Sequence, residues 1–318
     1  MAKLYRVRSA LAKIESSYGT DPTPTGSNDA IQLRNLEIQP AESEVLSRDL
    51  IRSYLGNSPQ LIANTRVVVT FEIEYSGSGA AGTAPKYDPI LRACGMEPTT
   101  VSSTSVTYKP RSTGFESCTI HYDTDGLRHI VTGCRGTFTI SLNANQIPVY
   151  NFTLTGQYNA PTDTASPTLT FSNQADPEIF NDTNTTGFTL FSATGLALES
   201  AEIDLGNEVI YRELVNSTKE VLITNRAATA NFVIEAPSLS TKDFFALSVA
   251  GTSGNLSIVH GATAGNIITL TSPATGLSLG NPSYSDSEGL VMLNIPSTMV
   301  PSSSGNDEIS IAYIFFFF

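Results

Sequence analysis

The chain has 318 residues, a mass of 33.9 kDa and a formal charge of −12 at pH 7. With 40% hydrophobic and only 15% charged residues, the composition excludes a disordered chain and a long coiled coil. The acidic balance argues against non-specific binding to nucleic acid or to an anionic membrane surface. No apolar run reaches about 18 residues and the first residues lack a secretory apolar core, so we expect no membrane insertion and folding in a cytoplasm.

The acidic charge is concentrated in the second half of the chain. Residues 161–318 contain four basic residues, Arg212, Lys219, Arg226 and Lys242, against 16 acidic ones, which gives −12 for this half. The first half is neutral, with 14 basic and 14 acidic residues. The two halves therefore differ in charge.

The predicted elements are strands with one short helix in each half. Residues 67–75, 136–142 and 149–154 alternate apolar and polar side chains, as half-buried strands do. A helix is predicted over 87–94, with Gly95 at its left-handed C-cap, and a tight hairpin turn at Asp125-Gly126. A second helix is predicted over 243–250, followed by Gly251. The packing faces of the helices are expected to include Tyr87, Ile90, Leu91, Cys94, Phe244 and Leu247.

Four short blocks recur in the same order in both halves. The first series is Glu37-Ile38, Arg48-Asp-Leu50, Arg66 to Glu74 and Lys86 to Gly95; the second is Glu202-Ile203, Arg212-Glu-Leu214, Arg226 to Glu235 and Lys242 to Gly251. Agreement of four blocks in register indicates an internal duplication. We therefore expect an all-β chain of two tandem β-sandwich or partial-barrel domains, residues 1–160 and 161–318, each with one flanking α-helix.

No pattern of catalytic or metal-binding residues is present. Cys118, His121, His129 and Cys134 are capable of binding a metal, but their spacing is wider than that of paired zinc ligands. The glycines at 77, 79 and 82 match a dinucleotide fingerprint but are separated from the helix by Thr83-Ala-Pro85, which favours a flexible connection. We expect no enzyme, no cofactor and no metal.

Several segments, taken together, resemble one known family. Residues 12–24, with Glu15-Ser-Ser-Tyr18-Gly19-Thr20, are similar to the opening stretch of the major tail tube proteins of long, non-contractile tailed phages. Residues 87–95 resemble the helix motif of that family. Asp125-Gly126, residues 133–136, Ile147-Pro148 and residues 152–158 resemble its closing strands in order. The resemblance covers residues 5–160.

The resemblance implies a tail-tube fold that assembles through its sheets into rings, which stack into a hollow tube in the virion. Its implied partners are other copies of the chain and the tail tip, tail terminator and tape measure proteins, while DNA passes through the lumen without specific binding. If the family ring contains six tube domains, a duplicated chain closes it with three copies. By position, the family's long inter-ring loop is residues 39–64. The inter-ring and assembly residues expected from the resemblance are Tyr5, Tyr18, Glu42, Glu44, Arg48, Asp49, Arg52 and Tyr54.

The C-terminal run Phe315, Phe316, Phe317 and Phe318 is expected to be buried at a strand edge or between subunits, because four free phenylalanines form an association patch. Removing the run is expected to impair folding or polymerisation. The negative charge suits either a lumen that repels DNA or a soluble outer surface. The alternative function is a carbohydrate- or receptor-binding β-sandwich of a virion or cell surface, although the chain lacks the tryptophans that such sites favour.

Overall fold

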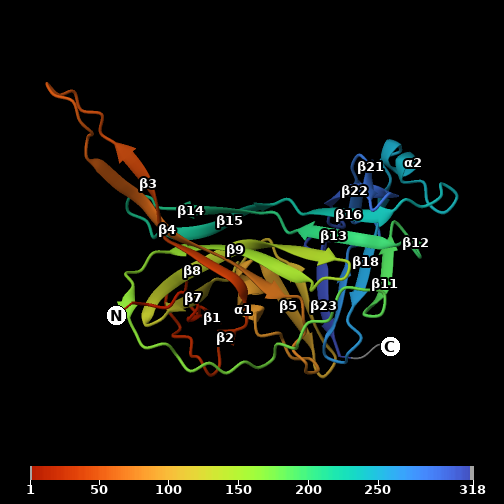
Figure 1. Ribbon diagram of the computed structural model, residues 1–318, viewed down its shortest axis with the longest axis horizontal. Coiled ribbons are helices and arrows are strands. Elements are labelled where there is room, and N and C mark those ends of the chain that lie inside the picture. Colours follow the sequence, from red (N-terminus) through yellow and green to blue (C-terminus); the bar gives the residue numbers. More distant parts are fainter. Residues whose placement is uncertain (1, 316–318) are drawn as a thin grey trace.

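The computed structural model describes residues 2–315 and is almost entirely β-structure, with two short helices (Figure 1). The all-β prediction is thus confirmed. The elements of the first half are β1 (Arg8–Ile14), β2 (Ala30–Ile31), β3 (Arg34–Ser47), β4 (Gln60–Glu74), α1 (Asp88–Ala93), β5 (Met96–Val101), β6 (Ser105–Pro110), β7 (Cys118–Thr124), β8 (Leu127–Asn143) and β9 (Val149–Gln157).

The second half begins with a long connection that contains only the short strand β10 (Thr162–Asp163). Its elements are β11 (Thr185–Leu190), β12 (Ala193–Thr194), β13 (Leu198–Asp204), β14 (Asn207–Arg212), β15 (Glu220–Arg226), β16 (Thr229–Glu235), α2 (Phe244–Val249), β17 (Ser253–Gly254), β18 (Leu256–His260), β19 (Ile267–Thr271), β20 (Leu277–Leu279), β21 (Ser283–Ser287), β22 (Leu290–Met299) and β23 (Ser310–Ile314).

One wide sheet runs through both halves of the chain. Its central strands follow the order β3, β4, β9, β8, β13, β16, β22 and β21, and every neighbouring pair is antiparallel. The long strand β8 makes this continuity possible, because its first part pairs with β7 and its last part pairs with β13. The two halves are therefore joined by a continuous sheet and not by a flexible linker alone.

A second sheet also crosses between the halves, in the order β12, β11, β18, β19, β23, β6 and β5. Strand β23, the last of the chain, pairs with β6 of the first half and places Tyr313 in the core there. The Tyr313 hydroxyl bonds with those of Tyr150 at 2.8 Å and Tyr87 at 3.0 Å, and Tyr87 donates to the Ser76 carbonyl at 2.6 Å. Burial raises the pKa of all three phenols, so they act as neutral hydrogen-bonding groups.

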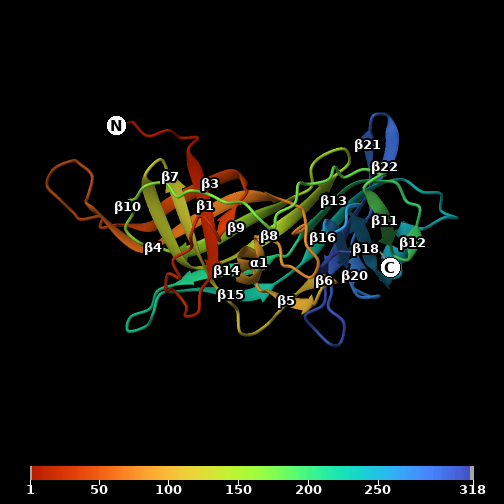
Figure 2. The ribbon, with the colours of Figure 1, turned by 90° about the horizontal axis from the view of Figure 1, so that it is seen from below.

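The long connection between the halves lies along the first half (Figure 2). Backbone bonds join Thr164 to Gly126, Thr170 to Gly26, and Ala175 to Gly77 along its course. The predicted domain boundary near residues 161–167 lies at the start of this segment.

The helices and hairpin turn form at the predicted positions. Gly95 and Gly251 follow α1 and α2 in left-handed conformations, with φ of +78° and +61°, which relieve the Cβ clash at a helix end. Asp125 and Gly126 both have positive φ in the turn between β7 and β8. In α1 the residues Tyr87, Ile90, Leu91 and Cys94 are buried; in α2 Phe244 is buried, but Leu247 is half-buried and Ala250 is exposed.

The expected long loop over residues 39–64 is mostly strand, and that prediction was wrong. Strand β3 continues to Ser47 and β4 starts at Gln60, so only residues 48–59 connect them. Paired backbone groups satisfy their hydrogen bonds in a two-stranded ribbon even where the ribbon leaves the body of the protein. We call residues 39–66 the β3–β4 arm; Figure 1 shows it extending beyond the end of the sheet.

Candidate assembly surfaces

Two of the motifs that carry the family resemblance in the first half meet at one buried carboxylate, that of Glu15. Glu15 accepts hydrogen bonds from the hydroxyls of Ser117 and Thr119, both at 2.6 Å, and from the backbone N–H groups of Gly133 at 2.7 Å and Gly19 at 2.8 Å. Four donors around one buried carboxylate fix the N-terminal segment against β7 and β8. Gly133 has φ +62°, and a Cβ there would lie 2.7 Å from the Tyr18 hydroxyl oxygen, so glycine is required for this contact.

Tyr18 belongs to the contact between the two halves. Its hydroxyl accepts from the backbone N–H of Val221 in β15 at 2.5 Å and donates to the Gly133 carbonyl at 3.3 Å. The Arg135 guanidinium lies 4.8 Å from the centre of its ring, which is a favourable cation–π distance. Burial raises the pKa of Tyr18 to about 12, so the phenol is neutral at physiological pH.

Arg135 is a second residue of the first half that binds β15. Its guanidinium donates to the carbonyls of Phe115, Glu116 and Val221 and pairs with the Glu220 carboxylate at 3.2 Å. The side chains of Val221 and Ile223 are buried at this contact, and each such burial contributes about 1.5–3 kcal/mol. From the sequence, Arg135 belongs to the motif of residues 133–136 but has no predicted role, and Val221 is not singled out; the alternation of Val221 and Ile223 with other residues is the signal for β15 in the sequence.

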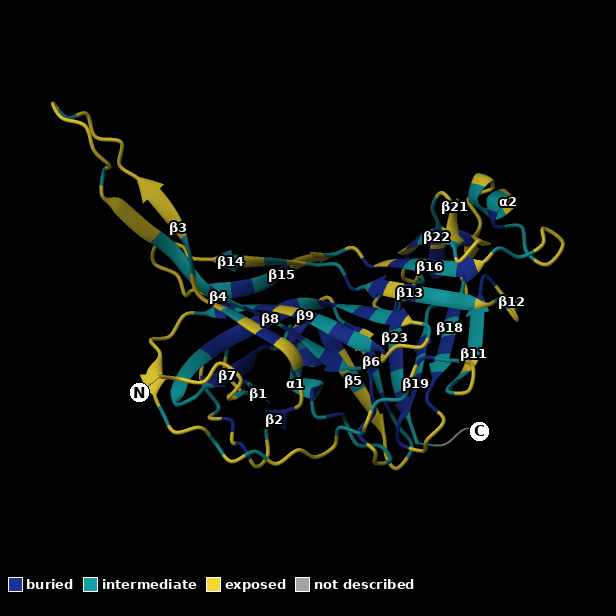
Figure 3. Ribbon diagram, viewed as in Figure 1, coloured by how far each residue is buried: buried dark blue, intermediate teal, exposed yellow. Residues whose placement is uncertain are grey.

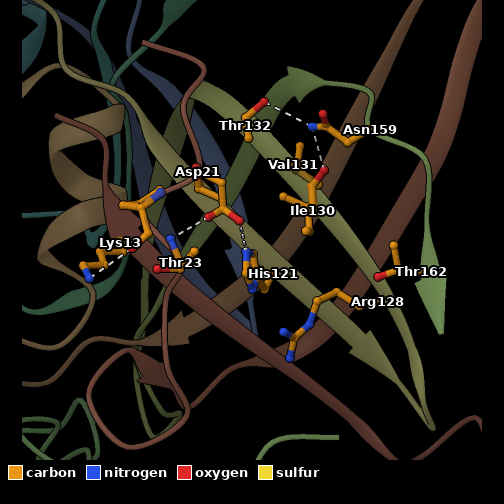
Figure 4. Close-up of polar contacts among 12 residues, drawn as sticks. Lys13, Asp21, Thr23, His121, Arg128, Ile130, Val131, Thr132, Asn159 and Thr162 are labelled. Atoms are coloured by element: carbon orange, nitrogen blue, oxygen red, sulfur yellow. Dashed lines mark hydrogen bonds and ion pairs between the residues drawn. The ribbon is translucent and has the colours of Figure 1, made fainter. Parts of the chain in front are cut away.

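Polar contacts fix the residues that follow β1 and those that follow β9 (Figure 4). Asp21 accepts from the Thr23 backbone at 2.8 Å and lies 3.0 Å from Nε2 of His121. Lys13 donates to the Pro22 carbonyl, and Asn159 to the Ile130 carbonyl and the Thr132 hydroxyl. Burial lowers the pKa of His121 despite the neighbouring Asp21. These groups are engaged with each other and serve to order the chain.

The wide sheet has one polar face. Residues opposite one another in antiparallel strands point to the same side, so the register defines rows across the sheet. One row is Arg34, Glu72, Asn151, Thr139, Asp204, Thr229 and Thr298; a second is Glu74, Val149, Ser141, Glu202, Asn231 and Pro296. The opposite face carries core residues such as Phe71, Phe152 and Phe138. Carboxylates outnumber the one arginine in these rows, and Arg34 lies 3.7 Å from Glu72.

The β3–β4 arm is mostly exposed (Figure 3) and carries eight of the exposed large apolar side chains of the described residues. Its exposed apolar side chains are Val45, Leu46, Leu50, Ile51, Tyr54, Leu55, Leu61 and Ile62, and those of Ile51 and Leu55 are fully accessible. Contiguous exposed apolar surface of this kind is typical of protein interfaces. The β14–β15 ribbon of the second half lies instead against β8, β9 and β4.

The structure places most of the expected assembly residues on or near the arm. Glu42 pairs with Arg66 at 2.7 Å, Glu44 accepts from Asn64 at 2.9 Å, and Asp49 accepts from the Ser47 hydroxyl. Arg48 is exposed, and Arg52 lies 5.7 Å from the ring of the exposed Tyr54. Tyr5 is exposed, and the Arg8 guanidinium lies 4.2 Å from the centre of its ring. Tyr18 is the exception, because it is engaged within the chain.

Of the four C-terminal phenylalanines, Phe315 lies within the described residues. The Phe315 backbone N–H donates to the Thr104 carbonyl at 3.1 Å. Phe316, Phe317 and Phe318 lie outside the described residues.

Within residues 2–315, the side chains form no cluster of three or more metal-capable groups, and no helix is long and apolar enough to cross a membrane. Cys118 and Cys134 lie opposite each other in β7 and β8 and, like Cys94, are buried free thiols. Burial raises the pKa of Cys94 and Cys134, which leaves these thiols protonated and unreactive.

The sheet architecture, the polar face and the exposed arm together describe a subunit built for assembly. The chain belongs to the phage tail tube protein family, whose match covers residues 6–311 and so includes both halves. It is therefore a structural component of a bacteriophage virion that self-associates into a tail tube. No curated protein matches the chain.

Proposed function

We propose that the chain is the major tail tube subunit, and that three copies form each ring of a hollow conduit for phage DNA. The observation that carries this proposal is the wide sheet, to which each half contributes four strands in the same spatial order. Strands β3, β4, β9 and β8 of the first half correspond to β13, β16, β22 and β21 of the second. A chain with two such units supplies two sixths of a pseudo-sixfold ring.

The same correspondence supports the duplication into residues 1–160 and 161–318. In each half a long two-stranded ribbon, β3 with β4 or β13–β14 with β15–β16, precedes a six-residue helix ending in a left-handed glycine. Glu37 lies opposite Thr70, and its block equivalent Glu202 lies opposite Asn231. The matching positions of these two glutamates support the duplication.

The size of the resulting barrel fits the proposed cargo. Three copies would join about 24 strands; at about 4.8 Å per strand and a tilt of about 40°, the backbone circle is about 48 Å across. Inward side chains take up about 10 Å of this width. The remaining bore accommodates a DNA duplex roughly 20 Å wide.

The polar face of the wide sheet is the proposed lumen lining. Its threonine, serine and asparagine side chains offer no cation to the phosphates, and its carboxylates repel them. A wall of this kind lets DNA slide, whereas a lysine- or arginine-rich wall would retain it.

Electron microscopy of the concentrated full-length protein, with rotational averaging of end-on views, tests the proposal. Tubes or rings of three chains with a central bore are the expected result. Rings of six chains would overturn the trimer and indicate that residues 161–318 form an outer decoration. A solution that contains only monomers, also in the presence of the phage's tail-tip complex, would contradict the tube-subunit function.

A further inference from the structure

The joint between the two halves is visible within a single chain. It consists of the antiparallel pairing of β8 with β13, in which Ser141 lies opposite Glu202, Ile140 opposite Ile203, and Thr139 opposite Asp204. Beyond this pairing, the β14–β15 ribbon continues onto the first half, where the Asn207 side chain donates to the Cys94 carbonyl at the end of α1. This joint has two parts, a strand pair and a ribbon that lies on the neighbouring unit.

The two outer strands of the wide sheet are the equivalents of the strands that form this joint. Strand β21 pairs with β22 as β8 pairs with β9, and β22 pairs with β16 as β9 pairs with β4. Phe71 in β4 lies opposite Phe152, and its repeat equivalent Phe232 in β16 lies opposite Ile295. Counting from these anchors, β21 corresponds to the last part of β8, and the start of β3 corresponds to β13.

We propose that β21 of one copy pairs antiparallel with β3 of the next copy, in the register of the internal joint. Ser285 then lies opposite Glu37, Tyr284 opposite Ile38, and Ser283 opposite Gln39. This inference rests on the proposed ring and specifies the contact that closes it. The partner is a second copy of this chain, bound head to tail.

Both strands have the free edge that such pairing needs. Among the described residues, β3 pairs only with β4 and β21 only with β22, and the two edges lie at opposite ends of the sheet (Figures 1 and 2). Unpaired edge N–H and C=O groups form a template for another strand. A head-to-tail contact uses two different surfaces, and it closes a ring when the rotation between neighbouring copies divides a full turn into a whole number of steps.

The faces of the side chains agree with the proposed register. Tyr284 lies opposite the buried Leu293, and Ile38 opposite the buried Val69, so both side chains are on the core side of the sheet. Tyr284 is 65% exposed in the single chain, and Ile38 would cover it as Ile203 covers Ile140. Ser285 and Glu37 lie on the polar side, where the internal joint also pairs a serine with a glutamate.

The β3–β4 arm supplies the second part of the joint. Its counterpart β14–β15 buries Val221 and Ile223 on the first half, whereas Val45 and Ile62, which lie opposite each other on one face of the arm, are exposed. In the neighbouring copy the arm would reach the end of α2, where Val249 is 92% exposed. An apolar ribbon and an apolar helix end, both uncovered in the single chain, thereby cover each other.

Cysteine cross-linking in assembled full-length protein tests the register. Residues opposite each other in antiparallel strands have Cα atoms about 4.5–5.5 Å apart, within the range that a disulfide spans. The variant Glu37→Cys/Ser285→Cys, oxidised with oxidised glutathione, is expected to give covalent trimers that reductant returns to monomers. The buried native cysteines do not interfere.

Matched variants provide the controls. Ser141→Cys/Glu202→Cys places the same pair in the internal joint and is expected to give a cross-link within one chain. Gln39→Cys/Ser285→Cys shifts the register by two residues and is expected to give little cross-linking. If the double variant fails to fold, mixing the single variants Glu37→Cys and Ser285→Cys must give covalent dimers, because each chain then carries only one partner.

The outcomes separate this inference from the proposed function. Trimeric rings in the microscope without the Glu37–Ser285 cross-link, or with more cross-linking from Gln39, would overturn the strand pairing and leave the tube function intact. A cross-linked ladder that ends at six chains would support the pairing but overturn the trimer. Protein that forms no rings and no cross-links would contradict both.

Discussion

The Tyr18 hydroxyl accepts a hydrogen bond from the backbone N–H of Val221, 203 residues later in the chain, at 2.5 Å. This contact joins the opening motif of the first half to the β14–β15 ribbon of the second. Tyr18, which the family resemblance places among the assembly residues, is thus engaged in joining the two halves of one chain.

Removing the Tyr18 hydroxyl should weaken the contact between the β14–β15 ribbon and the first half of the chain. In Tyr18→Phe, the Val221 N–H and the Gly133 carbonyl lose a partner in a buried place, which costs about 1–3 kcal/mol of unfolding free energy. Chemical denaturation of the unassembled protein measures the loss. The control is Tyr5→Phe, at an exposed tyrosine, which should change stability by less than about 0.5 kcal/mol. Equal stabilities of the two variants would show that the hydrogen bond is not needed.

Stability should fall as the pH drops below about 6.5. Burial lowers the pKa of His121, His129 and His260 in the folded state, so below the unfolded histidine pKa of about 6.5 the unfolded chain binds more protons. The stability that the neutral histidines allow is complete above that pH, and it is lost as the pH falls towards the pKa of these histidines in the folded state. Nδ1 of His260 lies 3.1 Å from the Thr185 hydroxyl and Nε2 lies 3.2 Å from the Glu178 carbonyl, an environment suited to neutral imidazole.

The variant His260→Asn tests the contribution of one of these groups. Its unfolding free energy should depend less steeply on pH between 7.5 and 5 than that of the natural protein, although it is lower at pH 7.5. Denaturant titrations across this range give both slopes. An unchanged slope would mean that His260 titrates alike in the folded and unfolded states.

Positive charge on the polar face should make the tube bind DNA. The variant Thr139→Lys/Thr153→Lys adds two cations per chain to this face, and phosphate contacts then release counterions. Assembled variant tubes should retain short duplex DNA at low salt and release it as salt rises, whereas natural tubes should not retain it. Co-sedimentation measures retention. Thr99→Lys, on an exposed position of the other sheet, is the control; DNA binding by that variant alone would contradict the lumen assignment.

The tip of the β3–β4 arm should control stacking of rings rather than their closure. Residues 48–59 connect the two strands and carry the accessible apolar side chains of Ile51 and Leu55. Replacing residues 50–56 by a short glycine–serine turn removes this surface and leaves β3 and β4 paired. Electron microscopy should then show single rings in place of tubes. Tubes of normal length would contradict an inter-ring role for Arg52 and Tyr54.

The sequence by itself determined the local elements and their repetition. Alternation placed Thr137, Thr139 and Ser141 on one side of a strand and Phe138 and Ile140 on the other, because successive side chains in a strand point to opposite faces. Glycines at the ends of the two helices and in the hairpin turn were predictable because few other residues adopt positive φ there. The short motifs of the first half led to the tail tube family through their resemblance to it.

Only the tertiary structure decided how these elements join. The pairing of β8 with β13, the passage of β23 into the first half, and the contact of Arg135 with Val221 involve residues far apart in sequence, and a strand pattern does not specify its partner. The arm was expected as a loop from its position in the family resemblance, whereas backbone pairing of β3 with β4 makes most of it a two-stranded ribbon. The sequence likewise does not show which strands lie at an edge of the sheet, because this depends on the order in which all the strands pair.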